Sequence, residues 1–384
     1  MANRIVLNET SYHGAGAIAE IANEAKTRAF KKAFVCSDPD LIKFGVTKKV
    51  TDVLDNAGLA YEIYSNIKPN PTIENVQTGV AAFKKSGADY LIAIGGGSSM
   101  DTAKAIGIII ANPEFEDVRS LEGVAPTKKP SIPIIAVPTT AGTAAEVTIN
   151  YVITDVEKKR KFVCVDTHDI PVIAVVDPDM MSSMPKGLTA STGMDALTHA
   201  VEAYIGHSNT KDTSEKAEVA TKLIFENLEE AYKNGKDLHA REQMLLASHY
   251  AGIAFTRAYV GNVHAIAHNL GGFYGVPHGL ANAIILPYVL DFYGETAYER
   301  LARLCECAGV AKAGQTDEQK ALDFIQAIRD MNARMNIPDK IDKIQEKDIE
   351  TIAKRACKEA NPLYPVPRIM DLDDCIAIIH RLMP

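Results

Sequence analysis

Two pairs of side chains with helical spacing, and one further histidine, have the clearest capacity for chemistry in this sequence. Asp195 and His199 are four positions apart, and His264 and His268 repeat that spacing. Residues four apart on an α-helix lie on one face, a turn from each other, so both members of a pair can point toward one ion. His278 follows in a Pro-His-Gly turn. Together these residues predict a cluster of nitrogen and oxygen donors.

This donor set predicts a transition-metal site. Imidazole nitrogen combined with a carboxylate suits Fe²⁺ or Zn²⁺, whereas Ca²⁺ and Mg²⁺ prefer oxygen ligands. The HExxH motif of metalloproteases is absent, because alanine follows both His199 and His264. A lone helical histidine is more often structural, but four of the ten histidines gather in this pattern.

A run of three glycines, Gly95 to Gly97, predicts a binding site for the phosphates of a nucleotide. The run follows an apolar strand at 90–94 and precedes a helical segment at 102–109. Glycine lets the backbone approach a ligand closely, and a helix N-terminus offers free N–H groups and a positive dipole end. Neither the GxGxxG fingerprint nor a Walker-type loop is present, so an ordinary turn is the alternative.

Two other polar positions at strand ends favour a nucleotide. A threonine-rich turn with Thr139, Thr140 and Thr143 follows the next strand, and its hydroxyls suit ribose or phosphate contacts. Asp38 ends the first strand, where a carboxylate accepts hydrogen bonds from ribose hydroxyls and repels a 2′-phosphate. A helix-capping role for Asp38 is equally compatible with its position.

The elements that must position these residues fall into two halves. In the first half, short apolar strands alternate with amphipathic helices, which predicts a parallel, Rossmann-like α/β sheet. The expected strands are 32–37, 60–64, 90–94, 132–137 and 172–176, and the expected helices include 46–57 and 72–86.

From Pro185 onward the apolar spacing is helical. A helix opened by an Asp212-x-x-Glu215 capping box is expected to end at Asn234-Gly235. Further helices are expected at 240–254, 263–270, 280–292, 296–307, 317–331 and 372–382. We therefore expect an α/β dinucleotide-binding domain over 1–184, an all-α metal-binding domain over 185–384, and an active site in the cleft between them.

Composition excludes several classes of protein. The chain has 384 residues, and its 47% hydrophobic content is too high for a disordered chain. A net charge of −8 argues against nucleic acid and anionic membranes as partners. The basic run Lys158 to Lys161 is interpreted as a solvated turn. Six scattered cysteines, no secretory leader and no long apolar stretch predict a reduced, cytoplasmic protein without a membrane span.

Taken together, these motifs resemble those of the iron-containing, group III alcohol dehydrogenases over nearly the full length. The resemblance is carried by the coenzyme turn Gly95–Ser98 with Asp101 and Lys104, and by the long segment 137–154. It is also carried by the iron signature Gly261-x-x-His264-x-x-Ala267-His268-x-x-Gly271 followed by Pro277-His278-Gly279.

The resemblance implies a metal set of Asp195, His199, His264 and His278, holding Fe²⁺ with Zn²⁺ as an alternative. It implies that His268 is not a ligand but lies near the nicotinamide, and that the chain forms a homodimer. The cofactor implied is NAD(H). Its implied contacts are Asp38, Asn70, Gly95, Gly96, Gly97, Ser98, Asp101, Thr139, Thr140, Thr143 and Lys161, the last of which revises the solvated-turn interpretation at that position.

The implied reaction is the interconversion of lactaldehyde and 1,2-propanediol, or of related short aldehydes and alcohols. His268 is the candidate for proton relay, because imidazole titrates near neutral pH. The implied substrate pocket contains Asn150, Val152, Phe255 and Val260. One segment departs from the family: Cys357-Lys-Glu-Ala-Asn361-Pro362-Leu363 replaces a Cys-Thr-Gly-Gly-Asn-Pro-Arg-like run.

Three alternatives stay open at this level. Another short-chain alcohol, 1,3-propanediol or glycerol dehydrogenase of the same family would have similar ligands. A lyase resembling dehydroquinate synthase would need many basic residues, which the stretch 259–264 lacks. A non-enzymatic metal-binding protein would carry two ligand systems without chemistry between them.

Overall fold

The computed structural model describes residues 4–384, which form two compact units. Unit 1 comprises the chain as far as Thr140 together with Ala144–Ser183. Unit 2 comprises Ala141–Thr143 and Met184–Pro384. A short piece of the threonine-rich turn therefore belongs to unit 2, although the chain on either side of it belongs to unit 1.

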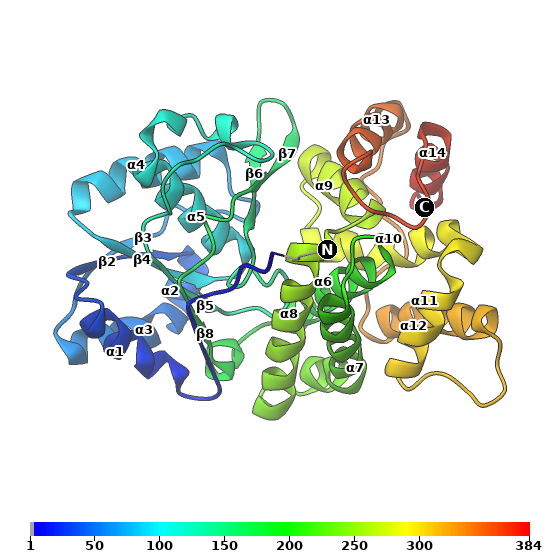
Figure 1. The fold of residues 1–384 in the computed structure, drawn as a ribbon, viewed down its shortest axis with the longest axis horizontal. Helices are drawn as coiled ribbons and strands as arrows, with labels where there is room; N and C mark the ends of the chain where they lie inside the picture. The colour runs from blue at the N-terminus through cyan, green and yellow to red at the C-terminus, as the bar shows by residue number, and fades with distance from the viewer. Residues whose placement is uncertain (1–3) are drawn as a thin grey trace. The chain divides into compact units, whose positions relative to one another are not determined.

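Unit 1 is built on a parallel six-stranded sheet in the order β1-β8-β5-β4-β2-β3 (Figure 1). The strands are β1 (Thr10–His13), β2 (Lys32–Ser37), β3 (Ala60–Tyr64), β4 (Tyr90–Gly95), β5 (Ile134–Pro138) and β8 (Ile173–Val176). Strands β4 and β5 are buried along their whole length, as expected for central strands covered on both faces. The parallel α/β fold predicted from the sequence is confirmed.

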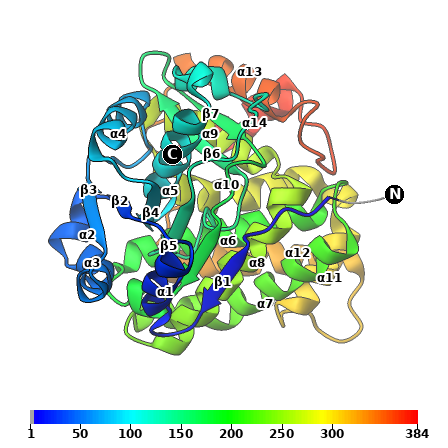
Figure 2. The same cartoon turned by 60° about the vertical axis from the view of Figure 1, so that its left-hand side comes forward.

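Helices cover both faces of this sheet. One face packs against α4 (Ile73–Ser86) and α5 (Gly97–Ala111), through Val76, Val80 and Ile106 among others. The opposite face packs against α1 (Glu20–Thr27) and α3 (Val46–Ala57). The edge strand β1 is seen clearly in Figure 2. A short helix, α2 (Pro39–Lys43), follows β2. Asp38, Gly95 and Thr139 lie at the carboxyl ends of β2, β4 and β5.

Unit 1 also contains an antiparallel hairpin that sequence analysis did not predict, formed by β6 (Asn150–Asp155) and β7 (Arg160–Val165). The strands alternate buried and half-buried residues, so one hairpin face is covered. The expected helix at 102–109 is longer than predicted, because α5 already begins at Gly97. Glycine is a poor helix former, so propensity misplaced that start.

Unit 2 is helical throughout, as predicted. Its helices are α6 (Lys186–Ile205), α7 (Lys211–Lys233), α8 (Leu238–Ala258), α9 (Asn262–Tyr274), α10 (His278–Tyr293), α11 (Tyr298–Cys307), α12 (Asp317–Arg334), α13 (Ile349–Ala360) and α14 (Leu372–Arg381). Helix α6 packs against α7, α8 and α10, while α9 packs against α10 and α13.

One capping assignment was wrong. The capping box of α7 is formed by Thr210 and Thr213, not by Asp212 and Glu215. Thr210 has extended backbone angles and accepts the N–H of Thr213, so the helix begins one residue before Asp212. The predicted end at Asn234 is confirmed. Helix α13 was not expected.

Two properties of the described residues bear on the sequence-based expectations. Within residues 4–384, no helix is long and apolar enough to cross a membrane. All six cysteines are free thiols, and four of them are buried: Cys36, Cys164, Cys305 and Cys375.

Candidate active site

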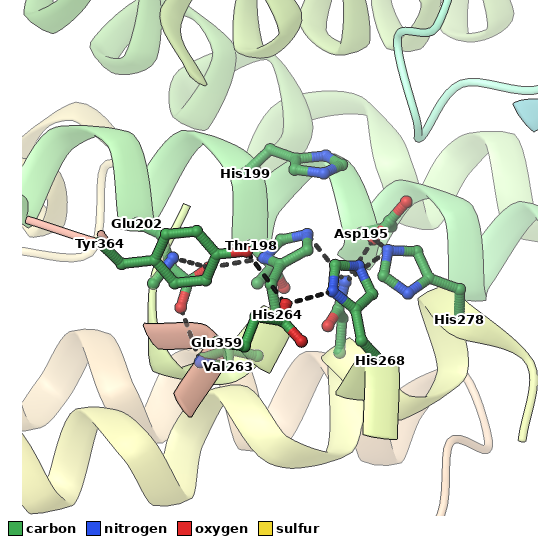
Figure 3. Close-up of polar contacts among 12 residues, drawn as sticks. Asp195, Thr198, His199, Glu202, Val263, His264, His268, His278, Glu359 and Tyr364 are labelled. Carbon is green, nitrogen blue, oxygen red and sulfur yellow. Dashed lines mark hydrogen bonds and ion pairs between the residues drawn. The ribbon is translucent and has the colours of Figure 1, made fainter. Parts of the chain in front are cut away.

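Three helices of unit 2 bring together the four side chains expected to bind a metal. Asp195 and His199 come from α6, His264 from α9, and His278 is the first residue of α10. One donor atom from each lies within 4.8 Å of the other three (Figure 3). The helical spacing read from the sequence explains the pairing within α6, and the packing of α9 and α10 against each other brings in the other two.

The donors are buried, but not equally. Asp195 is 1% exposed, His199 4% and His264 2%, whereas the His278 side chain is 23% exposed. Of the four side chains, that of His278 is the most exposed to solvent.

Two of the imidazoles are oriented by backbone or carboxylate oxygens. The Nδ1 of His199 lies 3.2 Å from the carbonyl oxygen of Gly142, and the Nδ1 of His264 lies 2.5 Å from Oε2 of Glu202. A ring that donates its Nδ1 hydrogen keeps its lone pair on Nε2. Both rings thus hold Nε2 as the donor atom, in the manner of ligand histidines supported by an outer partner.

Glu202 also joins α6 to the start of α9. Its carboxylate accepts hydrogen bonds from the backbone N–H of Gly261, at 2.9 Å, and of Val263, at 2.8 Å. Burial alone would lower the pKa of His264, but the Glu202 carboxylate raises that pKa above its ordinary value. Sequence analysis missed Glu202, although its position one turn after His199 on the same helix was an available signal.

The amide of Asn282, one turn after His278 in α10, lies among the donors. Its Nδ2 is 2.7 Å from Oδ1 of Asp195, 3.1 Å from Nε2 of His264 and 3.2 Å from Nε2 of His278. Three acceptor atoms from three helices therefore converge on one polar group. Sequence analysis did not identify this residue.

The donor set fits a transition-metal ion. Burial, together with the neighbouring His264, holds the pKa of His199 well below its ordinary value, so that ring stays neutral and keeps a lone pair for an ion. One donor atom from each of the four side chains lies close to the other three, and one carboxylate with three imidazoles is a set that Fe²⁺ and Zn²⁺ accept.

His268 lies beside this cluster without belonging to the four-donor set. Its ring stacks on His278, with centroids 5.1 Å apart and planes 15° apart, and meets His264 edge-on at 5.8 Å. Its Nδ1 is 2.6 Å from Oε1 of Glu359 in α13 (Figure 3). Phe255 of α8, expected in the substrate pocket, stacks on His199 at 4.1 Å.

The glycine turn of unit 1 has the geometry of a close backbone approach. Gly95 has a φ of 150°, and a Cβ there would lie 2.4 Å from Oγ of Ser99. A Cβ on Gly96 would lie 2.9 Å from Oγ1 of Thr140. Gly96 is the N-cap of α5 and brings no side chain to cap it. The first N–H groups of this buried helix can therefore serve an anionic ligand.

Two residues of the predicted coenzyme turn, Asp101 and Lys104, have hydrogen-bond partners within unit 1. Oδ2 of Asp101 accepts the N–H of Val152 at 3.0 Å, and burial raises the pKa of Asp101 to about 6. Lys104 is fully buried and donates to the carbonyl oxygens of Thr148 and Asn150. Burial lowers the pKa of Lys104. Both side chains attach α5 to the β6–β7 hairpin.

The remaining predicted residues are distributed over both units. Asp38 caps α2, because its Oδ1 accepts the N–H groups of Asp40 and Leu41. Thr139 is buried and donates its N–H to the carbonyl oxygen of Gly95. The others are Asn70, which has a positive φ, Ser98 and Thr140 at the glycine turn, Asn150 and Val152 in β6, Lys161 in β7, Thr143 in unit 2 and Val260 after α8.

Family models match both halves of the chain. Residues 8–178 match the model described as iron-containing alcohol dehydrogenase. Residues 189–383 match the model of the C-terminal part of the Fe-containing alcohol dehydrogenase family.

Individual relatives span the whole chain. Lactaldehyde reductase of Escherichia coli (strain K12) is 47% identical over 99% of both chains. A crystal structure of 1,3-propanediol oxidoreductase superimposes with a TM-score of 0.95 at 36% identity, covering all of both chains. Sulfoacetaldehyde reductase from Bifidobacterium kashiwanohense, in complex with NAD⁺, gives a TM-score of 0.86 at 27% identity, covering 100% of this chain and 99% of that one.

Proposed function

The chain belongs to the iron-containing alcohol dehydrogenase family and is an oxidoreductase, and we propose that it interconverts lactaldehyde and 1,2-propanediol with NAD(H). The observation that carries the proposal is the four-donor cluster of α6, α9 and α10 in a chain 47% identical to a lactaldehyde reductase. A second candidate is a 1,3-propanediol dehydrogenase, which the likeness to 1,3-propanediol oxidoreductase favours.

The metal would be held by Asp195, His199, His264 and His278, and Fe²⁺ is the proposed ion, with Zn²⁺ as the alternative. A divalent ion held there supplies a Lewis acid for the substrate oxygen. Glu202 and the carbonyl oxygen of Gly142 keep two of the imidazoles in the ligand orientation. The His278 side chain is partly exposed, and a short aldehyde is proposed to approach the metal ligands from the side of His278.

The coenzyme would bind unit 1 at the carboxyl ends of β2, β4 and β5. The uncapped N-terminus of α5 and the close approach at Gly95 and Gly96 suit the pyrophosphate. The second carboxylate oxygen of Asp38 is proposed to accept from the ribose, while its Oδ1 caps α2. The further proposed contacts are Asn70, Gly97, Ser98, Asp101, Thr139, Thr140, Thr143 and Lys161.

In the proposed reaction, aldehyde, NADH and one proton give alcohol and NAD⁺. His268 is the proposed proton relay, since its ring lies beside the donor cluster and its Nδ1 is already engaged by Glu359. Asn150, Val152, Phe255 and Val260 are the proposed pocket residues. Most of the proposed coenzyme contacts belong to unit 1, and the four proposed metal ligands belong to unit 2.

Steady-state oxidation of NADH with lactaldehyde, after anaerobic loading with Fe²⁺ or Zn²⁺, tests this function. We expect lactaldehyde to give a higher kcat/KM than 3-hydroxypropanal, and metal-free protein to be inactive. A preference for 3-hydroxypropanal would select the second candidate, and turnover without metal would refute the proposed mechanism.

Two variants test the residue roles. His268→Ala is expected to keep its metal and lose turnover, whereas His264→Ala is expected to lose both. Parallel loss of metal and activity in His268→Ala would show that His268 is a ligand. The homodimer and the cytoplasmic location stay predictions, which gel filtration with light scattering and cell fractionation would test.

A further inference from the structure

We propose that Glu359 is a positioning residue for His268. Its carboxylate accepts the Nδ1 hydrogen of His268 and so holds the imidazole in one orientation and one tautomer, with Nε2 as the atom presented to the substrate. The assignment deepens the proposed function, on which it rests for the substrate, but the contact and the tautomer are properties of the protein itself.

The first observation is the contact between α9 and α13. Oε1 of Glu359 lies 2.6 Å from Nδ1 of His268, slightly below the roughly 2.7–2.9 Å of a charge-assisted N–H···O hydrogen bond. The His268 side chain is 6% exposed and that of Glu359 20%. Water has little access to this pair, so the carboxylate competes with few other acceptors for the ring N–H.

A second donor fixes the carboxylate. The hydroxyl of Tyr364, just after α13, donates to the same Oε1 of Glu359 at 3.0 Å. Tyr364 is buried, and burial, reinforced by the Glu359 charge, raises the pKa of its hydroxyl well above the ordinary value. The hydroxyl therefore remains a donor over the working pH range. With two donors on one oxygen, the carboxylate has one favoured rotamer.

The consequence for His268 follows from the hydrogen count of imidazole. A neutral ring carries one N–H, and a ring that donates from Nδ1 has its lone pair on Nε2. The plane of the ring is set independently by stacking on His278 at 5.1 Å. Glu359 fixes which nitrogen carries the hydrogen, and the stack fixes where the other nitrogen points. A proton relay needs both.

A graded series of variants tests the role. Glu359→Gln keeps an acceptor oxygen but loses the charge, and Glu359→Leu loses both. We expect kcat to fall about 10-fold in the first and up to about 100-fold in the second, with unchanged metal content. Tyr364→Phe, which keeps the ring, is expected to lower kcat roughly fivefold through a less ordered carboxylate. Glu350→Gln, on the same helix and paired only with the exposed Lys354, is the matched control and should retain wild-type kcat.

The decisive readout is the tautomer of His268, measured by ¹⁵N NMR on histidine-labelled, Zn²⁺-loaded protein. The His268 signals are assigned as those missing from His268→Gln. We expect a pure Nδ1–H form in wild type and Glu350→Gln, and a mixture with the Nε2–H form in Glu359→Leu. A merely structural role for Glu359 would lower the thermal stability without changing the tautomer.

The outcomes separate this proposal from the proposed function. A wild-type protein that reduces none of the aldehydes but shows the Nδ1–H form, lost in Glu359→Leu, supports the positioning role and refutes the function. An unchanged tautomer in a folded Glu359→Leu protein overturns the positioning role. If Glu359→Leu does not fold, the same comparison is made with Glu359→Ala, which also removes the acceptor. A parallel loss of metal in any of these variants also overturns it, because Glu359 would then act on the metal site.

Discussion

Replacing Glu202 by glutamine is the sharpest test of how the metal centre is held. The Glu202 side chain is almost fully buried, and its two oxygens accept three hydrogen bonds, from His264 Nδ1 and from the N–H groups of Gly261 and Val263. Glutamine is the same size but offers one acceptor oxygen. One amide orientation serves His264 and Gly261 and leaves Val263 facing an NH₂ group, and the other does the reverse.

The expected magnitude follows from this choice. In the better orientation, a charge-assisted bond to His264 becomes a neutral one, which forfeits about half of its ~1.5–3 kcal/mol. That loss of ~0.75–1.5 kcal/mol corresponds to roughly a 4- to 13-fold weaker binding of metal. If the amide turns its NH₂ group to His264, the loss approaches the ~100-fold seen when outer partners of ligand histidines are removed. The buried N–H left without an acceptor costs a further ~1–3 kcal/mol of folding free energy.

The assay is competition for Zn²⁺ against a chromophoric chelator, combined with urea unfolding of the metal-free protein. Glu359→Gln is the matched control, since it removes a carboxylate from a histidine that is not among the four donors. We expect Glu202→Gln to raise the Kd for Zn²⁺ and to lower stability, and Glu359→Gln to leave the Kd unchanged. A wild-type Kd in Glu202→Gln would refute the reasoning, because the outer carboxylate would then contribute nothing to the site.

Three other predictions concern unit 1. Burial raises the pKa of Asp101 to about 6, so the neutral carboxyl contributes to the free energy of unfolding fully below pH ~3.8, and this contribution is lost as pH rises through 6. Between pH 4 and pH 8, urea unfolding should therefore show Asp101→Asn gaining up to ~3 kcal/mol of unfolding free energy relative to wild type, and a pH-independent difference would contradict this. Gly96→Ala places a Cβ 2.9 Å from Oγ1 of Thr140 and should weaken NADH binding about tenfold in a fluorescence titration, whereas Gly187→Ala, with nothing within 4 Å, should not. Asp38→Ser keeps a cap on α2 and removes the charge, so kcat/KM with NADPH should rise relative to that with NADH; an unchanged ratio would place Asp38 away from the ribose.

Local pattern was sufficient to predict much of unit 1 and most helices of unit 2. The strands at 32–37 and 60–64 and the helix at 46–57 were predicted to the residue, because each is a short apolar run or amphipathic stretch bounded by turn residues. The hairpin β6–β7 was missed because its stability comes from pairing between strands rather than from either strand alone. Helix α13 was missed although it is strongly amphipathic.

The residues of the candidate site also fall into two groups, those that local sequence pattern predicts and those that it does not. The sequence by itself determined which donors exist and that Asp195 pairs with His199, since residues four apart share a helix face whatever the fold. It also predicted, through glycine, a phosphate site at the turn after β4 in unit 1, which stays a prediction. These are consequences of local geometry, which the order of residues specifies completely.

Only the tertiary structure decided which distant groups support those donors. Glu202 of α6 meets Gly261, Val263 and His264 at the start of α9. Glu359 meets His268 across 91 positions of sequence because α13 packs against α9. The sequence around a carboxylate does not indicate which group it will contact, since a Glu or Asp is equally compatible with an exposed position. Burial beside a particular imidazole is what turns it into an orienting group, and burial is a property of the packed chain.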